Sequence, residues 1–472
     1  MSWPNERAGA PTTLGDDALR LLVDALGDAW TSFRGPRPAE PRLDDAVRAD
    51  LERPLPDGPG DLAGTLAEAT AVLDASVSPA RPLYLAYVGS TGLEASALGA
   101  ALAATYDVNL ASQAGAIEAL ERQTLRWMAE FVGFPTPHGI FTSGGMTSNL
   151  TALLAARERA RPGTRTRGVG DARLTVHCSA EAHQSVVRAA EVAGIGTDGV
   201  RRVALDERRR MRPERLAAML DEDRRAGAVP VAVIATAGTT LTGAVDPLDA
   251  IADVCRERGV WLHVDGAYGL PAAAAPAARA SFAGLDRVDS ATVDAHKWMG
   301  VQKSCSLLLV RDPAALAEAF SHREGYMPHD AGQVNPVDLT LEYSRPVNSI
   351  KLWAALRTYG AAAYREWIDH TITLARTLAA TLRGRDDYEL LHEPELSTLC
   401  FRQLRPGVDL DRHNARLAAA AREDGRIYLA AAEVDGATCL RVCFTNFRTR
   451  TAHLDELLAV LDELGDRLWR TV

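Results

Sequence analysis

The sequence predicts an α/β protein with a mostly parallel sheet in a large domain and a smaller α+β domain at the C-terminus. Short runs that are apolar on both faces alternate with helical stretches, which is typical of a parallel sheet covered by helices on both sides. The expected strands are LTVHCS (174–179), VAVIATA (231–237), VWLHVD (260–265), SATVDA (290–295) and SLLLV (306–310). Further along, the pattern changes to a helical stretch at 349–383, an alternating strand at 440–444 and a terminal helix at 453–469.

The length of 472 residues predicts more than one packed unit. Residues 1–80 combine a helical pattern at 16–31 with a Pro-rich stretch, GPRPAEP (35–41). We expect this N-terminal segment to lie over the body of the molecule or over a partner subunit, and not to fold alone. Residues 81–345 then make up the expected large domain, and residues 346–472 the expected small domain.

The charge balance restricts the class of partner. Lys and Arg number 52 and Asp and Glu number 62, so the net charge is −10. A net-negative surface attracts neither the phosphate backbone of nucleic acids nor anionic lipid, so we expect neither partner. The first twenty residues hold no apolar block of the signal-peptide type, and no run is apolar enough for a membrane span. We therefore expect a cytoplasmic protein.

The six cysteines favour reduced, buried thiols. They stand at positions 178, 255, 305, 400, 439 and 443, with no CxxC pair, and a disulfide framework is not expected in a chain of this size. Cys439 and Cys443 are four residues apart and also compatible with a metal pair, but no cluster of further ligands lies near them in the sequence. Core packing is the simpler interpretation, and we expect no metal site.

Two charged residues follow predicted strands. Lys297 lies in VDAHKWMG (293–300), where a lysine is usually an exposed residue whose stem covers apolar surface. In a dry pocket its amine would lose its proton more easily, and a neutral amine condenses with an aldehyde. Asp265 ends the strand VWLHVD and either caps the next turn or, opposite a heterocyclic nitrogen, keeps that nitrogen protonated. Ligands of parallel sheets lie at this edge.

A Gly-Gly turn lies between a strand-like end and a helix in FTSGGMTSNL (141–150). The backbone N–H groups of Gly144 and Gly145, together with the start of the helix, can bind an anion. The same pair is also typical of a tight turn. His183 stands at the start of another predicted helix, and Thr240 and Asp246 follow a strand, where all three are also compatible with ordinary cap and turn chemistry.

Taken together and in order, these motifs resemble the fold type I, group II decarboxylases that depend on pyridoxal 5′-phosphate (PLP), which include the aromatic amino-acid and glutamate decarboxylases. The most specific motifs are HVDGAY, DAHKW, TSGGMTSNLTALLAAR, ATAGTTLTGAVDP and IKLWAALRTYG. The interval of 32 residues between Asp265 and Lys297 is also similar to that of the family. The resemblance covers nearly the whole chain and implies the aspartate-aminotransferase-like fold, PLP as cofactor and an amino acid as substrate.

The resemblance also implies a role for each matching residue. Lys297 is expected to hold PLP as a Schiff base, His183 to stack on its ring, and Asp265 to pair with its pyridine nitrogen. The other expected contacts are those of Ala267 with the ring face, Gly144 and Gly145 with the phosphate, Asp294 and His296 nearby, Thr240 and Asp246 as supports, and Tyr87 in the substrate pocket. A homodimer with the active site at the interface is implied as well.

One segment departs from the family pattern. Decarboxylases of this group carry a mobile-loop tyrosine that protonates the carbanion after CO₂ leaves, but in residues 325–353 tyrosines occur only near the ends, as Tyr326 and Tyr343. His329 is the candidate acid in its place, and Arg345 stands where paired arginines are usual. We therefore expect His329 and Arg345 in the substrate pocket.

The departure leaves several reactions open. Decarboxylation of an L-amino acid is the first expectation. Without a positioned acid, decarboxylation coupled to oxidative deamination gives an aldehyde, and a leaving group on Cβ permits β-elimination. A protein that binds PLP without turnover is a fourth alternative, against which the joint presence of Lys297, Asp265 and His183 speaks.

Overall fold

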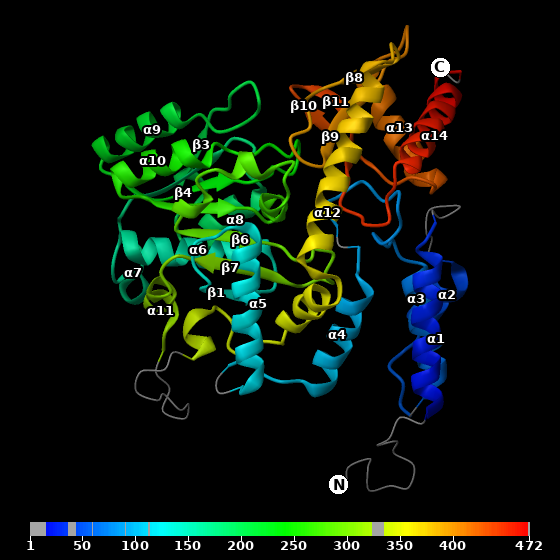
Figure 1. Cartoon of the computed structure of the whole chain (residues 1–472), viewed down its shortest axis with the longest axis horizontal. Coiled ribbons are helices and arrows are strands. Elements are labelled where there is room, and N and C mark those ends of the chain that lie inside the picture. Colours follow the sequence, from blue (N-terminus) through cyan, green and yellow to red (C-terminus); the bar gives the residue numbers. More distant parts are fainter. Residues whose placement is uncertain are drawn as a thin grey trace, which may run out of the picture.

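The computed structural model describes residues 16–35, 44–58, 60–89, 91–111, 114–322 and 335–470. The predicted fold class is confirmed, because a seven-stranded, mostly parallel sheet is followed by a smaller four-stranded antiparallel sheet (Figure 1). The large sheet has the order β1-β7-β6-β5-β4-β2-β3, in which β7 runs antiparallel to both of its neighbours. Its strands are β1 (Gly139–Thr142), β2 (Leu174–Ser179), β3 (Val200–Val203), β4 (Val229–Thr236), β5 (Trp261–Asp265), β6 (Ser290–Val293) and β7 (Ser306–Val310).

Helices cover both faces of the large sheet (Figure 1). Successive side chains of a strand point to opposite faces, so Ile234 of β4 packs on one layer while Val233 and Ala235 pack on the other. The first layer contains α6 (Gly145–Ala160), α8 (Gln184–Val192) and α11 (Ala314–Phe320). The second contains α5 (Ala116–Val132), α9 (Pro213–Arg225) and α10 (Leu248–Arg258). The two further helices of this part of the chain are α4 (Glu94–Tyr106) and α7 (Thr164–Arg167).

The long helix α12 (Ser349–Arg383) joins the two sheets, and Figure 1 shows it in gold between them. It bends at Gly360, whose φ of 78° and ψ of 157° are not helical. Before and just after the bend it packs in the large core through Leu352 and Tyr364, and further along it packs in the small core through Leu378. Leu83 also belongs to the small core. Helix α12 thus belongs to both cores, and a residue just after position 80 packs in the small core. The domain boundaries expected at residues 80 and 345 therefore stay a prediction.

The C-terminal part is an antiparallel sheet with helices on one side. Its strands follow the order β10-β11-β9-β8. They are β8 (Tyr388–Leu390), β9 (Thr398–Gln403), β10 (Ala430–Val434) and β11 (Ala437–Cys443), with the helices α13 (Leu410–Asp424) and α14 (Ala452–Trp469). All six cysteines are buried and have free thiols, as the sequence predicts.

The N-terminal helices lie to one side of this body. They are α1 (Asp16–Ser32), α2 (Asp45–Leu51) and α3 (Leu62–Asp74), and Figure 1 shows them side by side in blue. Leu19, Leu22 and Val23 of α1 are 50%, 41% and 66% exposed. No helix in the described ranges is both long and apolar enough to cross a membrane.

A buried ion pair fixes the segment that leads into α12. The guanidinium of Arg345 contacts the carboxylate of Glu121 on α5 at 2.7 Å, and both residues are buried. A second nitrogen of the same guanidinium donates to the carbonyl of Phe141 in β1 at 3.4 Å. Arg345 therefore ties the approach to α12 to both α5 and the strand that precedes the Gly-Gly turn.

Removing one partner of this pair leaves the other charge buried and uncompensated. We expect Glu121→Ala to lower the free energy of unfolding by about 3–5 kcal/mol, measured by urea denaturation. The control is Glu393→Ala, which breaks the ion pair with Arg383, whose side chains are 54% and 74% exposed, and which is expected to cost less than about 1 kcal/mol. Equal losses in the two variants would contradict the structural role of Arg345.

Candidate active site

Asp265, Asp294 and Lys297 lie at the carboxyl edge of the neighbouring parallel strands β5 and β6. Asp265 is the last residue of β5, and Asp294 directly follows β6. The segments beyond the two strands are joined, since the backbone N–H of Asp294 donates to the carbonyl of Ala267 at 3.1 Å. The backbone N–H of Ala267 in turn donates to Asp265 Oδ1 at 3.2 Å. The two strand ends therefore form one hydrogen-bonded unit.

Lys297 is held by Asp294. Its Nζ lies 2.9 Å from Asp294 Oδ2, and its backbone N–H donates to the carbonyl of the same residue at 2.9 Å. The second oxygen of Asp294 accepts a hydrogen bond of 2.6 Å from Ser306 Oγ, so the buried carboxylate has a partner on each oxygen. A quarter of the Lys297 side chain is exposed. The amine is thus fixed at the edge of the sheet and accessible to a small molecule.

Asp265 has a different environment, although it is also buried. Its Oδ2 accepts a hydrogen bond of 2.8 Å from the side-chain amide of Asn149. Within the part of the chain that the structure describes, no Lys or Arg forms an ion pair with Asp265. A buried carboxylate that is bonded only to neutral donors is suited to pair with a cationic group of a ligand.

The Gly-Gly turn approaches these carboxylates closely. A Cβ on Gly145 would lie 2.8 Å from Asp294 Oδ2 and 3.1 Å from the Cβ of Ala267, so only glycine fits there. A Cβ on Gly144 would meet no protein atom within 4 Å. Gly145 begins α6, whose first backbone N–H groups have no partner within the helix. This helix end is therefore suited to an anion, beside the amine of Lys297 and the carboxylate of Asp265.

His183 caps the start of α8. Its Nδ1 accepts a hydrogen bond of 3.2 Å from the backbone N–H of Ser185, and the residue is exposed. His296 lies 3.7 Å from Asp294 Oδ2, and burial lowers the pKa of its imidazole. Lys297, at 2.9 Å, is therefore the closer cationic partner of Asp294.

Asp246 supports the end of β4. Its two oxygens accept hydrogen bonds of 2.6 and 2.7 Å from the backbone N–H groups of Met211 and Thr236. Burial raises the pKa of this carboxyl to about 7. Thr240 is exposed on the loop that follows β4, whereas the buried Thr239 pairs with the hydroxyl of Thr242 at 3.0 Å.

Of the three residues expected in the substrate pocket, the structure describes Tyr87 and Arg345, and it brings neither into hydrogen-bonding contact with the site residues described above. Tyr87 is 56% exposed, and His329 lies outside the described residues. The guanidinium of Arg345 is engaged by Glu121. A substrate contact of these three side chains stays a prediction.

Two residues that the sequence interpretation did not select take part in the site. Asn149 of α6 binds Asp265, and Ser306 of β7 binds Asp294. Asn149 was detectable only as one of several polar residues at the start of the helix in TSGGMTSNLTALL. Ser306 became identifiable only with the pairing of β6 and β7, which no local pattern reveals.

Comparisons with known proteins show which family the chain resembles. Residues 47–404 match the pyridoxal-dependent decarboxylase conserved domain. The chain is similar to the aromatic-L-amino-acid decarboxylase of Bacillus atrophaeus, with 30% identity over 96% of this chain and 95% of that protein. It is also similar to the human cysteine sulfinic acid decarboxylase, with 35% identity over 61% of this chain and 60% of that protein.

A solved structure is similar over its whole length. The TDC of Oryza sativa, solved with PLP and tryptamine, superimposes with a TM-score of 0.91 and 26% identity, covering 98% of this chain and 100% of that one. The domain match, which spans more than half of the chain, and the similarity to a structure solved with PLP lead to one conclusion. The chain is an enzyme of the pyridoxal-dependent decarboxylase family, and its cofactor is PLP.

Proposed function

We propose that the enzyme removes the α-carboxyl group of an L-amino acid that is bound to PLP on Lys297. The observation that carries this proposal is the hydrogen-bonded connection between the two strand ends, in which Asp265, Ala267, Asp294 and Lys297 follow one another through contacts of 3.2, 3.1 and 2.9 Å. An amine that condenses with an aldehyde and an acid that pairs with a ring nitrogen are thereby kept at one edge of the sheet.

Bound PLP supplies an electron-withdrawing ring that draws in the electron pair of the bond that breaks. Asp265 holds the proton on the pyridine nitrogen, because a buried carboxylate favours a nearby cation. His183 lies at the start of α8 with its ring exposed, in keeping with stacking on the cofactor. Ala267 contacts the same ring, and its small side chain leaves space for it.

The phosphate binds at the start of α6. We expect the backbone N–H groups of Gly144 and Gly145 to donate to it, because a helix N-terminus favours a negative group and a Cβ position on Gly144 meets no protein atom within 4 Å. Asp294 and His296 lie behind this turn and orient Lys297. Asp246 supports the end of β4 through its bonds to Met211 and Thr236, and we expect Thr240 on the following loop to be a further support of the site.

A homodimer completes the proposed enzyme. The exposed apolar residues Leu19, Leu22 and Val23 of α1, and Leu98 and Leu102 of α4, support burial against a second copy. The N-terminal segment 1–80 would then cover the partner, and the active site would lie at the interface. The free cysteines support a reducing compartment, and we assign the enzyme to the cytoplasm.

The lysine content makes the covalent attachment easy to test. The chain has three lysines, Lys297, Lys303 and Lys351. We expect borohydride reduction to attach one PLP per chain, and peptide mass spectrometry to locate it on Lys297. Lys297→Ala is expected to abolish both the adduct and the visible absorption of the protein.

Two matched variants control this experiment. Lys303 is exposed, whereas Lys351 is partly buried, and burial lowers the pKa of its amine. Lys303→Ala and Lys351→Ala are expected to keep the adduct on Lys297. An adduct on either of these lysines in the native enzyme would refute the assignment.

A second candidate reaction is decarboxylation coupled to oxidative deamination, in which O₂ is the oxidant, one water is consumed, and the products are CO₂, an aldehyde, ammonia and hydrogen peroxide. The absence of a tyrosine from the middle of residues 325–353 favours this reaction, because an acid that protonates the substrate carbon competes with O₂. His329 is the residue in this segment that we propose as that acid.

We expect His329→Phe to change the product ratio from amine toward aldehyde and peroxide. Products are identified by mass after incubation with a panel of L-amino acids in air. His322→Phe is the control, because it removes a histidine that stands just before residues 325–353. This variant is expected to keep the original ratio of products. A ratio that stays the same in His329→Phe would exclude His329 as the acid.

A further inference from the structure

A series of buried hydrogen bonds leads away from Asp265 along the sheet. Trp261, His263 and Asp265 alternate on β5, so all three point to the side of α6. On the neighbouring strand β6, Ser290 is paired with His263, and Thr292 is paired with Asp265. These residues and Asn149 of α6 are all buried. The relay, as we call it, consists of Trp261, Ser290, His263, Asn149 and Asp265.

Each member of the relay contacts the next. Trp261 Nε1 donates to Ser290 Oγ at 2.9 Å, and Ser290 Oγ lies 2.8 Å from His263 Nδ1. His263 Nε2 lies 3.0 Å from Asn149 Oδ1. Asn149 Nδ2 then donates to Asp265 Oδ2 at 2.8 Å.

The chemistry of the two ends determines the direction of every bond. The indole N–H of Trp261 can only donate, so the hydroxyl proton of Ser290 is available to His263 Nδ1. An ionised Asp265 can only accept, so Asn149 turns its NH₂ group toward Asp265 and its carbonyl toward His263. His263 therefore carries its proton on Nε2, and all donors point toward the carboxylate.

A neutral His263 agrees with this direction. Burial lowers the pKa of its imidazole to about 4, although the charge of Asp265 acts in the opposite sense. At neutral pH the ring has one proton, and that proton is on Nε2. The relay therefore brings polarised neutral groups to Asp265 without adding a second charge.

The amide of Asn149 has a partner for every hydrogen-bonding position. Besides the bonds within the relay, its carbonyl accepts from Thr292 Oγ1 at 2.9 Å, and its NH₂ group donates to Ser185 Oγ at 3.2 Å. Ser185 in turn donates its backbone N–H to His183. A side chain with two donors and two acceptors satisfied has one orientation. Asn149 thus connects the acid beside the ring nitrogen with the cap residue of α8.

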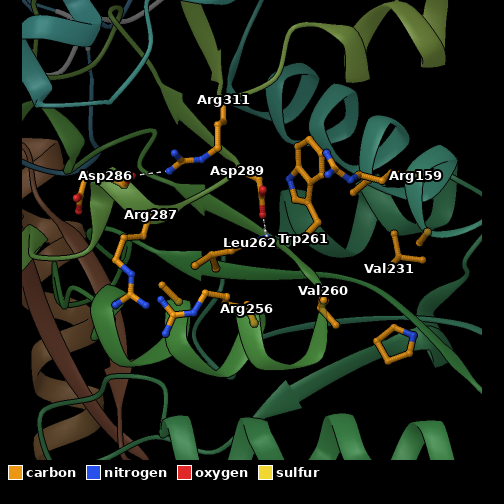
Figure 2. A pocket seen from close by; sticks show the side chains of 16 residues that line it. Arg159, Val231, Arg256, Val260, Trp261, Leu262, Asp286, Arg287, Asp289 and Arg311 are labelled. Atoms are coloured by element: carbon orange, nitrogen blue, oxygen red, sulfur yellow. Dashed lines mark hydrogen bonds between the residues drawn. The ribbon is translucent and has the colours of Figure 1, made fainter.

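The far end of the relay lies at the edge of the sheet opposite the active site. Trp261 is 6% exposed there and lines a surface hollow of about 450 Å³. Figure 2 shows this hollow, with Trp261 between Arg159 and Asp289. The guanidinium carbon of Arg159 lies 5.7 Å from the centre of the indole ring. Because all five members of the relay are buried, hydrogen bonds within it are stronger than those at a surface.

We propose that Asn149, oriented by His263 and Ser290, is a positioning residue that keeps Asp265 ionised and aimed at the pyridine nitrogen of PLP. This inference rests on the proposed function of Asp265. Hydrogen bonds to the ionised form of an acid favour that form, and bonds inside a protein are stronger when their donors are themselves polarised. Asn149 also leads to His183 through Ser185, but its bond to Asp265 acts on the cofactor only through the ring nitrogen.

That last property gives a selective test. Affinities of the cofactor-free protein are measured for PLP and for its carbocyclic analogue, in which a C–H group replaces the ring nitrogen. We expect Asn149→Ala to weaken PLP binding about tenfold or more, the effect of losing one hydrogen bond to a charged group, and to change binding of the analogue less than about twofold. Asn414→Ala removes an equally buried asparagine of the small domain and is expected to leave both affinities unchanged.

Three results would contradict the inference in distinguishable ways. Equal weakening of PLP and the analogue by Asn149→Ala would show a role in folding alone. An unchanged affinity for PLP would show no role. If the native protein itself binds the two compounds equally, the function proposed for Asp265 is wrong, and the inference is wrong with it.

A second readout does not depend on the cofactor. The imidazole nitrogen shifts of ¹⁵N-histidine-labelled protein report which nitrogen of His263 carries the proton, and His263→Gln identifies its signals. We expect a neutral ring protonated on Nε2, and a change in those shifts in Ser290→Ala. Thr175→Val, which removes a buried hydroxyl elsewhere in the same sheet, is expected to leave them unchanged. A charged ring or a proton on Nδ1 would overturn the direction of the relay.

Discussion

The hydrogen bond from the backbone N–H of Asp294 to the carbonyl of Ala267 connects the two segments on which the active site depends. It joins the residues that leave β5 to those that leave β6, so the acid of one strand and the lysine of the other keep a constant separation. Parallel strands end at the same edge of a sheet, and loops at that edge are free to carry chemistry. Here one backbone contact converts two such loops into a single rigid platform.

Two buried carboxylates lie on this platform and are stabilised in different ways. Asp294 has a cationic partner in Lys297 and a hydroxyl donor in Ser306. Among the described residues, Asp265 accepts from the amide of Asn149 and the backbone of Ala267 and has no cationic side chain beside it. The charge of Asp294 is thus neutralised within the chain, whereas that of Asp265 remains available to a cationic ring nitrogen. The close approach of Gly145 positions the start of α6 between the two.

Much of the fold was predictable, because buried strands are recognisable from local composition. The strands at 174–179 and 306–310 match β2 and β7 residue for residue. In the large sheet β3 was not predicted and β1 only as a strand-like end, since each has only four residues and the sequence of β3, VRRV, is half polar. In the small sheet only β11 was predicted, as the alternating run at 440–444. The long helix α12 has the predicted bounds, but its bend at Gly360 depends on packing against both cores.

The site was predictable to the extent that the motifs are contiguous. Short sequence motifs were enough to predict Lys297, Asp265 and the Gly-Gly turn. The roles of Asn149 and His263 depend on strand register and helix packing, which short motifs do not reveal. Arg345 was expected in the substrate pocket, and its contact with Glu121, which is 224 positions away in the chain, is invisible in a local pattern.

The central claim is that the carboxylate of Asp265 keeps the ring nitrogen of PLP protonated. The most direct measurement is the ¹⁵N chemical shift of that nitrogen in enzyme reconstituted with ring-labelled PLP. A shift typical of a protonated pyridine in the native enzyme, and of a neutral one in Asp265→Asn, is the predicted result. A neutral nitrogen in the native enzyme, or a protonated one in both proteins, would contradict the account.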